Sequence, residues 1–268
     1  MLINKCKINT KYLAHFSGFL LQRTYKYLSK LFTDLNNSIM NIIVNGGSKG
    51  IGREIVINLA GDPKNQILVT GRDASMLKSL SDSFKNVRTL TMDLVDFDSQ
   101  PDSARNSMYN IFKEVDILIN MAGFLIPKRF MDVGPTDARK MMEINFFGPS
   151  SAIRLLKPLM HAGSHIINIS SMGGFQGSSK YSGLSYYSAS KAAIACLSEC
   201  LAVEFAEYGI SVNCLALGAV QTEMFTEAFP GYKAPVNAKE MAGFVAYFAV
   251  NGQKFFNGKI IPVAVNNP

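Results

Sequence analysis

Residues Asn41–Gly52, with the sequence NIIVNGGSKGIG, decide how the rest of the chain is interpreted. The β-branched run Ile42-Ile43-Val44 predicts a short buried strand of a parallel sheet. Glycines then permit a sharp turn, and Gly50-Ile51-Gly52 opens a helix that runs towards Leu59. Such a strand, turn and helix N-terminus form an anion site, because free N–H groups and the positive helix end face one point. The spacing is not G-x-G-x-x-G, so the turn alone fits phosphate binding and a turn without ligand equally well.

Composition narrows the class of protein to one globular domain with a possible appendage. The chain has 268 residues, of which 48% are hydrophobic and 18% charged, which suits a single core. No run approaches 18 uninterrupted apolar residues, so a transmembrane helix is not expected. The four cysteines form no C-x-x-C pair, which gives a zinc site little support and predicts a reducing, cytoplasmic location. Cys196 and Cys200 are expected to be buried thiols on a helix.

The net charge of +7 is concentrated at one end of the chain. Residues 1–39 carry six lysines and arginines and a single acid, so the remaining chain is nearly neutral and no nucleic-acid footprint is expected there. Apolar residues recur at helical spacing in this N-terminal extension. Three interpretations stay open: an amphipathic helix on an anionic membrane surface, a targeting segment, or a segment absent from the natural product, with Met40 as the start.

Strands and helices alternate from residue 40 onward, which predicts an α/β fold with a Rossmann-type doubly wound parallel sheet of about seven strands. Six strands are located from the sequence: 42–44, 66–70, 87–92, 115–120, 165–170 and 258–263. Helices are expected over 98–112, 136–160, 186–207 and 240–250. We therefore expect residues 40–268 to form one catalytic domain, with ligands bound at the carboxyl ends of the strands.

The end of the second strand carries the first hint about the ligand. An acidic residue at this position would accept a ribose 2′-OH, but the chain has Gly71 followed by Arg72. Lys49 lies in the glycine turn, so two cations are expected to converge where a 2′-phosphate would sit. Ordinary surface charges are the alternative. Given a dinucleotide site, this pattern favours NADP over NAD.

Tyr187 and Lys191 form the candidate chemical centre. Four residues apart on a predicted helix, they share one face, and a nearby cation is expected to lower the phenol pKa from its ordinary value near 10. Ser171, at the end of the preceding strand, is placed to hydrogen-bond the same substrate oxygen. Asn145 lies inside an apolar helical pattern, where an amide needs a partner.

These residues together resemble the short-chain dehydrogenase/reductase family. NGGSKGIG stands where the family has T-G-x-x-x-G-x-G, and Asn120-Met121-Ala122-Gly123 resembles N-N-A-G. Asn145, Ser171, Tyr187 and Lys191 match the catalytic tetrad in order and spacing, and residues 217–222 resemble P-G-x-x-x-T. The resemblance covers residues 40–268. Asn45, Met121 and Leu217 depart from the family pattern without removing a catalytic group.

The resemblance implies a role for each matched residue. Tyr187 would be the general acid in reduction, Lys191 would lower its pKa and hold the nicotinamide ribose, Ser171 would polarise the carbonyl, and Asn145 would keep a water on a proton relay. Together with the two cations, the implied cofactor-binding residues are Gly46, Ser48, Lys49, Gly50, Ile51, Gly52, Arg72, Asp93, Leu94, Asn120, Ala122, Gly123, Tyr187, Lys191, Val220 and Thr222.

The resemblance further implies an NADPH-dependent carbonyl reductase or alcohol dehydrogenase that acts as a homodimer or homotetramer. A non-catalytic NADP-binding sensor is the alternative. Substrate choice would lie in residues 172–186 and 222–238, whose aromatic and small polar residues predict a modest, partly apolar substrate without a fixed charge. The sequence does not give the substrate, the direction of the reaction or the status of residues 1–39.

Overall fold

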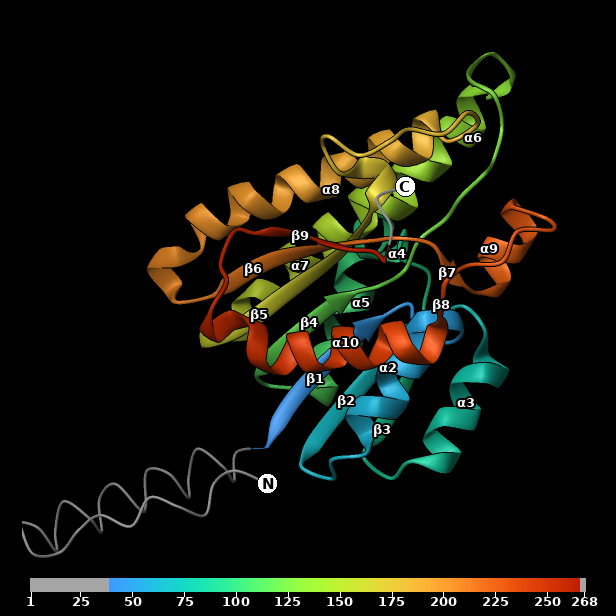
Figure 1. Ribbon diagram of the computed structural model, residues 1–268. Helices are drawn as coiled ribbons and strands as arrows, with labels where there is room; N and C mark the ends of the chain where they lie inside the picture. Colours follow the sequence, from blue (N-terminus) through green and yellow to red (C-terminus); the bar gives the residue numbers. More distant parts are fainter. Residues whose placement is uncertain (1–38, 266–268) are drawn as a thin grey trace, which may run out of the picture. The chain divides into compact units, whose positions relative to one another are not determined.

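A parallel sheet of seven strands organises the computed structural model, which describes residues 39–265 (Figure 1). The strand order is β3-β2-β1-β4-β5-β6-β9, and every pairing within it is parallel. The strands are β1 (Met40–Asn45), β2 (Asn65–Gly71), β3 (Val87–Thr91), β4 (Val115–Asn120), β5 (Met160–Ser171), β6 (Ser211–Leu217) and β9 (Ile260–Val263). The predicted N-terminal extension and its membrane or targeting roles lie outside the described residues.

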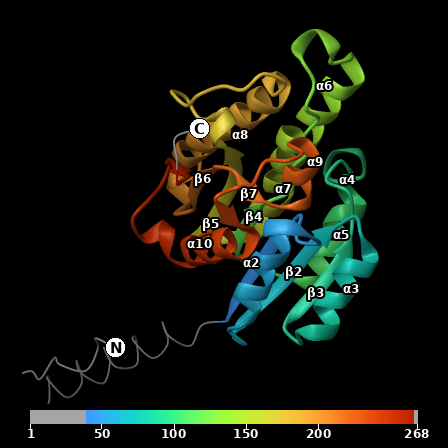
Figure 2. The ribbon, with the colours of Figure 1, turned by 45° about the vertical axis from the view of Figure 1, so that its right-hand side comes forward.

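Helices cover both faces of this sheet, as the two views in Figures 1 and 2 show. One face packs against α2 (Gly50–Ala60), α3 (Ala74–Ser83) and α10 (Ala238–Asn251). The other face packs against α5 (Pro101–Ile111), α7 (Gly148–Leu156) and the end of α8 (Ser185–Glu204). Because both faces are covered, the strands are apolar along most of their length, as the sequence pattern indicated. The predicted doubly wound fold is confirmed.

Short elements complete the rim of the sheet. They are α4 (Asp96–Ser99), α6 (Pro135–Met142), α9 (Glu223–Ala228) and the two-stranded pair of β7 (Val220–Gln221) and β8 (Val236–Asn237). The β7–β8 pair ties the segment after β6 to the start of α10. The N-terminus of α10 carries a capping box between Asn237 and Glu240, which fixes where that helix begins.

Several expected boundaries are wrong, and each has a local reason. The expected helix over 136–160 is broken into α6, a π-helical turn at Glu143–Phe147 and α7, and it gives way to strand β5 at Met160. The expected helix over 98–112 divides before Pro101, which begins α5. Strand β6 was not located from the sequence, although it lies inside the sheet, between β5 and β9.

The expected burial of two cysteines is also wrong. Cys196 and Cys200 are exposed on α8, whereas Cys214 on β6 is buried. Helix α8 turns a different stripe of residues towards the sheet, which includes Lys191, Ile194 and Ser198. Across the part of the chain that the structure describes, none of the helices combines the length and apolar character needed to cross a membrane.

Candidate functional site

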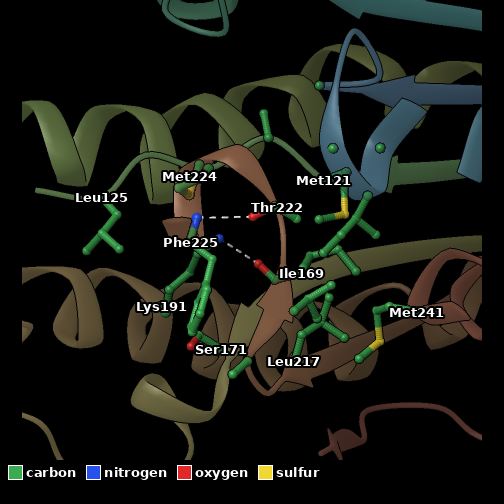
Figure 3. Close-up of a pocket in the computed structure, with 18 of the residues that line it drawn as sticks. Met121, Leu125, Ile169, Ser171, Lys191, Leu217, Thr222, Met224, Phe225 and Met241 are labelled. Carbon is green, nitrogen blue, oxygen red and sulfur yellow. Dashed lines mark hydrogen bonds between the residues drawn. The ribbon is translucent and has the colours of Figure 1, made fainter. Parts of the chain in front are cut away.

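A cavity of about 1000 Å³ lies at the carboxyl ends of the strands. Its wall begins at the glycine turn after β1 and continues past the ends of β2, β4, β5 and β6 to α9. Figure 3 shows part of this wall, where Ser171 and Lys191 lie among apolar side chains such as Leu125, Phe225 and Leu217. One cavity therefore joins the predicted anion site to the predicted chemical centre.

The glycine turn is built so closely that side chains would not fit. Gly46 has a φ of +88°, and a Cβ there would lie 2.5 Å from the Cα of Ala122. A Cβ at Gly52 would lie 2.1 Å from the carbonyl oxygen of Gly46. The turn after β1 and the turn after β4 therefore pack backbone against backbone, which leaves a shallow, side-chain-free floor in this part of the cavity.

The start of α2 supplies donors above this floor. The N-cap residue Lys49 makes no side-chain capping hydrogen bond, and the first turn carries no acidic residue. The first N–H groups of α2 are consequently available to a ligand, and they lie at the positive end of the helix dipole. Gly50 has a φ of +58°, and a Cβ there would have the Thr222 methyl group as its nearest neighbour, at 3.8 Å. This arrangement fits a pyrophosphate group.

A ladder of buried polar side chains crosses the sheet beneath the cavity. Thr70 donates to Asn45, Asn45 to Asn120, Asn120 to Asn168, and Asn168 to Ser198, over distances of 2.8–2.9 Å. These residues come from β2, β1, β4, β5 and α8 in turn. The ladder ties the strands that end at the glycine turn to the helix that carries Tyr187 and Lys191, and it satisfies amides that would be costly to bury unpaired.

Strand β5 and helix α8 are held together at Lys191. The Ser170 hydroxyl donates to the Lys191 carbonyl at 2.6 Å, and the Lys191 ammonium donates to the Ile169 carbonyl at 2.8 Å, a bond drawn in Figure 3. A Cβ at Gly174 would lie 2.5 Å from the Lys191 carbonyl carbon. The absence of a side chain at Gly174 is therefore required for the approach that brings Ser171 towards α8.

The Tyr187 phenol and the Ser171 side chain both line the cavity and lie close together. Burial raises the pKa of Tyr187, and the neighbouring Ser171 only partly opposes that effect. The expectation that Lys191 would lower this pKa is wrong for these side chains by themselves, because the loss of water around the phenol dominates. Burial also lowers the pKa of Lys191 to about 8, and the neighbouring Cys214 acts in the opposite direction.

Asn145 lies in the π-helical turn and is buried, but it does not line the cavity. Its amide oxygen accepts from the Phe124 N–H at 2.8 Å, and its amide nitrogen donates to the Phe124 carbonyl at 2.8 Å and to Ser190 Oγ at 2.9 Å. A Cβ at Gly123 would lie within 3.4 Å of Lys191 Nζ and 3.6 Å of Asn145 Oδ1. Asn145 thus holds the segment after β4 against α8.

The two cations at the predicted phosphate position each have an acidic neighbour. Lys49 Nζ lies 3.6 Å from Glu223 on α9, and Arg72 lies 3.7 Å from Asp93 after β3. All four side chains are at least one-third exposed, so these ion pairs are weak. Both cations line the cavity. Each lies beside a different carboxylate, so the two side chains do not converge on the expected position of a 2′-phosphate.

Most residues predicted for the site line this one cavity. The lining includes Gly46, Ser48, Lys49, Gly50, Ile51, Gly52, Arg72, Asp93, Leu94, Ala122, Gly123, Ser171, Tyr187, Lys191, Val220 and Thr222. Asn120 and Asn145 are the exceptions, since both are buried behind the wall. Sequence reasoning missed the supporting residues Asn168, Ser170, Ser190 and Ser198, because ordinary serines and asparagines carry no motif signal.

Comparisons of this chain with known proteins point to one protein family. The family model for short chain dehydrogenase matches residues 40–233. Dehydrogenase/reductase SDR family member 7B from Danio rerio is 31% identical over 203 residues, which cover 71% of this chain and 64% of that protein. The protein of the same name from Xenopus laevis is 29% identical over 77% of this chain and 66% of its own length. This chain therefore spans slightly less than two thirds of those two relatives.

Other similar proteins are matched over nearly their whole length. The 3-oxoacyl-[acyl-carrier-protein] reductase FabG of Aquifex aeolicus is 27% identical over 82% of this chain and 94% of its own. A short chain dehydrogenase from Burkholderia cenocepacia J2315, solved in complex with NADP, has a TM-score of 0.76 at 22% identity. It is covered over 97% of its length and supports the fold.

Proposed function

The chain belongs to the short-chain dehydrogenase/reductase family of NAD(P)-dependent oxidoreductases, and we propose that it reduces the carbonyl group of a small molecule with NADPH, or oxidises the corresponding alcohol. The observation that carries the proposal is the meeting of Ser171, Tyr187 and Lys191 in the wall of a cavity that continues to the glycine turn. The residues proposed for proton transfer and those proposed for nucleotide binding thus line the same cavity.

Three side chains divide the work at the substrate oxygen. The bound cofactor supplies the hydride that goes to the carbonyl carbon. Tyr187 gives its proton to the carbonyl oxygen. The phenol is protonated at neutral pH, and the burial that raises its pKa also makes it a weaker acid. Ser171 donates a hydrogen bond to the same oxygen. Lys191, held by Ile169, places a positive charge where negative charge develops.

Asn145 acts as a positioning residue in this proposal. Both hydrogens of its amide nitrogen are donated and its oxygen accepts from Phe124, so its side chain is occupied by protein contacts. Its bonds to Phe124 and Ser190 support a role in fixing the segment that follows Gly123 against α8, in addition to the proton relay that the resemblance implies.

The cofactor-binding assignment rests on the fit of the cavity wall to a dinucleotide. Gly46, Gly50 and Gly52 let the backbone approach the pyrophosphate, with Ser48 and Ile51 beside it. The ends of β3 and β4, through Asp93, Leu94, Ala122 and Gly123, border the adenosine, and the buried Asn120 supports this part of the wall from behind. Val220 and Thr222 bind the carboxamide, and Lys191 the ribose. We assign NADP rather than NAD because Gly71 presents no carboxylate and Arg72 and Lys49 supply positive charge.

A homodimer or homotetramer is the proposed assembly. On α8, Ile194 is buried in the core, Leu197 and Leu201 are half-buried, and Ala192 is exposed. The exposed stripe continues through Cys196, and Val203 is 79% exposed at the end of the helix. Sedimentation velocity of the purified chain tests this assignment, and a single monomeric species would contradict it.

The activity test is a panel of aldehydes and ketones with NADPH and with NADH, followed by nicotinamide absorbance. We expect turnover with NADPH that is lost in Tyr187→Phe and kept in Tyr186→Phe. The neighbouring Tyr186 ring stacks on Phe130 at 5.6 Å and does not line the cavity, so it is a matched control. Tight NADPH binding without turnover of any carbonyl would favour the non-catalytic sensor instead.

Cofactor preference is tested separately with Arg72→Ala. We expect this variant to raise the KM for NADPH about tenfold, a change typical of one lost charge-assisted contact, and to leave the KM for NADH unchanged. Arg105→Ala is the control, because Arg105 is also an exposed arginine with one acidic neighbour, Asp102 at 3.4 Å, but lies outside the cavity. Equal changes for the two cofactors would contradict the assignment.

A further inference from the structure

The part of the cavity wall contributed by the segments near Ser171 and Tyr187 and by α9 is largely apolar. The loops beside Ser171 and Tyr187, together with the segment after β7, contribute mainly aromatic and aliphatic side chains to the wall. They are Leu125, Tyr181, Leu184, Met224, Phe225, Phe229 and Tyr232. Such a wall favours a substrate with an extended apolar body, because each buried methylene contributes to binding.

Charged residues of the wall are few, and all but one have a partner. They are Lys49, Arg72, Asp93, Lys191, Glu223 and Lys233. The first five make the two ion pairs and the lysine–carbonyl bond described above. Lys233 forms no ion pair or hydrogen bond with any residue between 39 and 265. Both carboxylates of the wall already lie beside a cation, Glu223 beside Lys49 and Asp93 beside Arg72.

The backbone around Lys233 is fixed although its side chain is exposed. The N–H of the buried Ala234 donates to Gln221 Oε1 at 2.9 Å, and the N–H of Tyr232 donates to the Phe229 carbonyl at 3.1 Å. Gln221 itself lies on β7, which pairs with β8 just after Lys233. Lys233 is therefore part of the cavity wall on a segment whose backbone is anchored on both sides.

We propose that Lys233 binds an anionic group at the far end of the substrate, so that the physiological substrate is an elongated aldehyde or ketone that ends in a carboxylate or phosphate. This inference rests on the proposed function and leaves its chemistry unchanged: the hydride goes to the carbonyl carbon and the Tyr187 proton to the oxygen. It differs from the sequence-based expectation of a substrate without fixed charge, which rested on the aromatic and small polar residues of this segment. A lysine suits this role because its ammonium is a compact point charge on a flexible stem.

The test compares medium-chain oxo carboxylic acids with their methyl esters and with the corresponding phosphate monoesters, all with NADPH. The wild type is expected to favour an anionic series over the esters. Lys233→Gln is expected to lower kcat/KM for that anionic series about fivefold, the effect of one partly exposed charge pair, and to leave the esters unchanged. The anionic series with the larger loss identifies the end group.

Lys239→Gln serves as the control, because Lys239 is an exposed lysine on α10 outside the cavity. Equal losses for acids and esters, or a raised KM for NADPH with every substrate, would assign Lys233 to packing or to the cofactor and overturn the proposal. A wild-type preference for esters would do the same while leaving the carbonyl reductase assignment intact. Failure to turn over any carbonyl would reject both.

Discussion

The Lys191 ammonium donates a 2.8 Å hydrogen bond to the Ile169 carbonyl, two residues before Ser171 on the same strand. This bond fixes the charged end of a side chain from α8 against β5, in the same cavity wall as Tyr187 and Ser171. Because the lysine is only 3% exposed, its charge is held in the site at a cost in stability.

That cost predicts a pH dependence of stability. The pKa of Lys191 is lowered from 10.5 to about 8, so between these values the unfolded chain binds more protons than the folded protein. Stability therefore rises with pH across this window, by about 3 kcal/mol from this residue alone. In urea titrations over that range, Lys191→Met should lack this increment while Lys239→Met keeps it. Wild-type and Lys191→Met curves that run parallel would contradict the prediction.

Gly174 sets the distance between β5 and α8. Gly174→Ala would place a Cβ 2.5 Å from the Lys191 carbonyl carbon, which forces the two elements apart. We expect kcat to fall at least about tenfold, because misplacement of a reacting group on the ångström scale is costly. Gly243→Ala on α10 is the control, since a Cβ there meets no atom within 4 Å. The measurements are steady-state kinetics and a thermal melting curve. A Gly174→Ala variant that keeps the wild-type kcat and melting temperature would refute this account of Gly174.

The buried amide ladder predicts a second kind of sensitivity. Asn168→Ala leaves the Asn120 amide without its acceptor and Ser198 without its donor. The free energy of unfolding should fall by about 1–3 kcal/mol, the cost of an unsatisfied buried polar group. Asn58→Ala, which removes an exposed bond to Glu54, should change it by less than about 0.5 kcal/mol. Similar losses for the two variants in urea unfolding would count against a structural role for the ladder.

His165 predicts weakening of the fold in acid. Its ring contacts the Ala249 carbonyl and the Asn213 amide, each at 3.0 Å, and burial lowers its pKa from 6.5 to about 4. The neutral ring is therefore favoured in the folded state, and its contribution is complete above pH 6.5 and lost as the pH falls towards 4. The loss amounts to about 3 kcal/mol.

The measurement for this prediction is guanidinium unfolding across that pH range. His165→Gln should be less stable at neutral pH but should lose less stability on acidification than the wild type. His161→Gln should follow the wild type, because His161 is an exposed residue beside Asp116. An unchanged acid dependence in His165→Gln would show that other groups control acid unfolding.

Local signals were enough to predict the fold class and the position of the cavity. The glycine turn, the Tyr187–Lys191 spacing and the polar residues that end β4 and β5 each follow from a few neighbouring residues. Partners brought in by tertiary packing were not predictable in this way. Asn168, Ser170, Ser198 and Gly174 matter because of what lies across from them, and the raised pKa of Tyr187 reflects burial that a helix spacing does not show.

The same limit explains the errors in detail. The π-helical turn at Glu143–Phe147 carries Asn145, whose partner Phe124 lies 21 residues away in the sequence. Cys196 and Cys200 are exposed because α8 packs by a neighbouring stripe. Strand β6 lacked distinctive end signals in the sequence, and the acidic neighbours of Lys49 and Arg72 come from other elements.

The most direct test of the central claim is deuterium transfer from NADPH labelled on the nicotinamide ring to a carbonyl that the enzyme turns over. The account predicts label on the product carbinol carbon with the wild type and with Tyr186→Phe. It predicts almost no labelled product with Tyr187→Phe, although that variant still binds NADPH. Labelled product formed at the wild-type rate by Tyr187→Phe would contradict the assignment of Tyr187 as the proton donor.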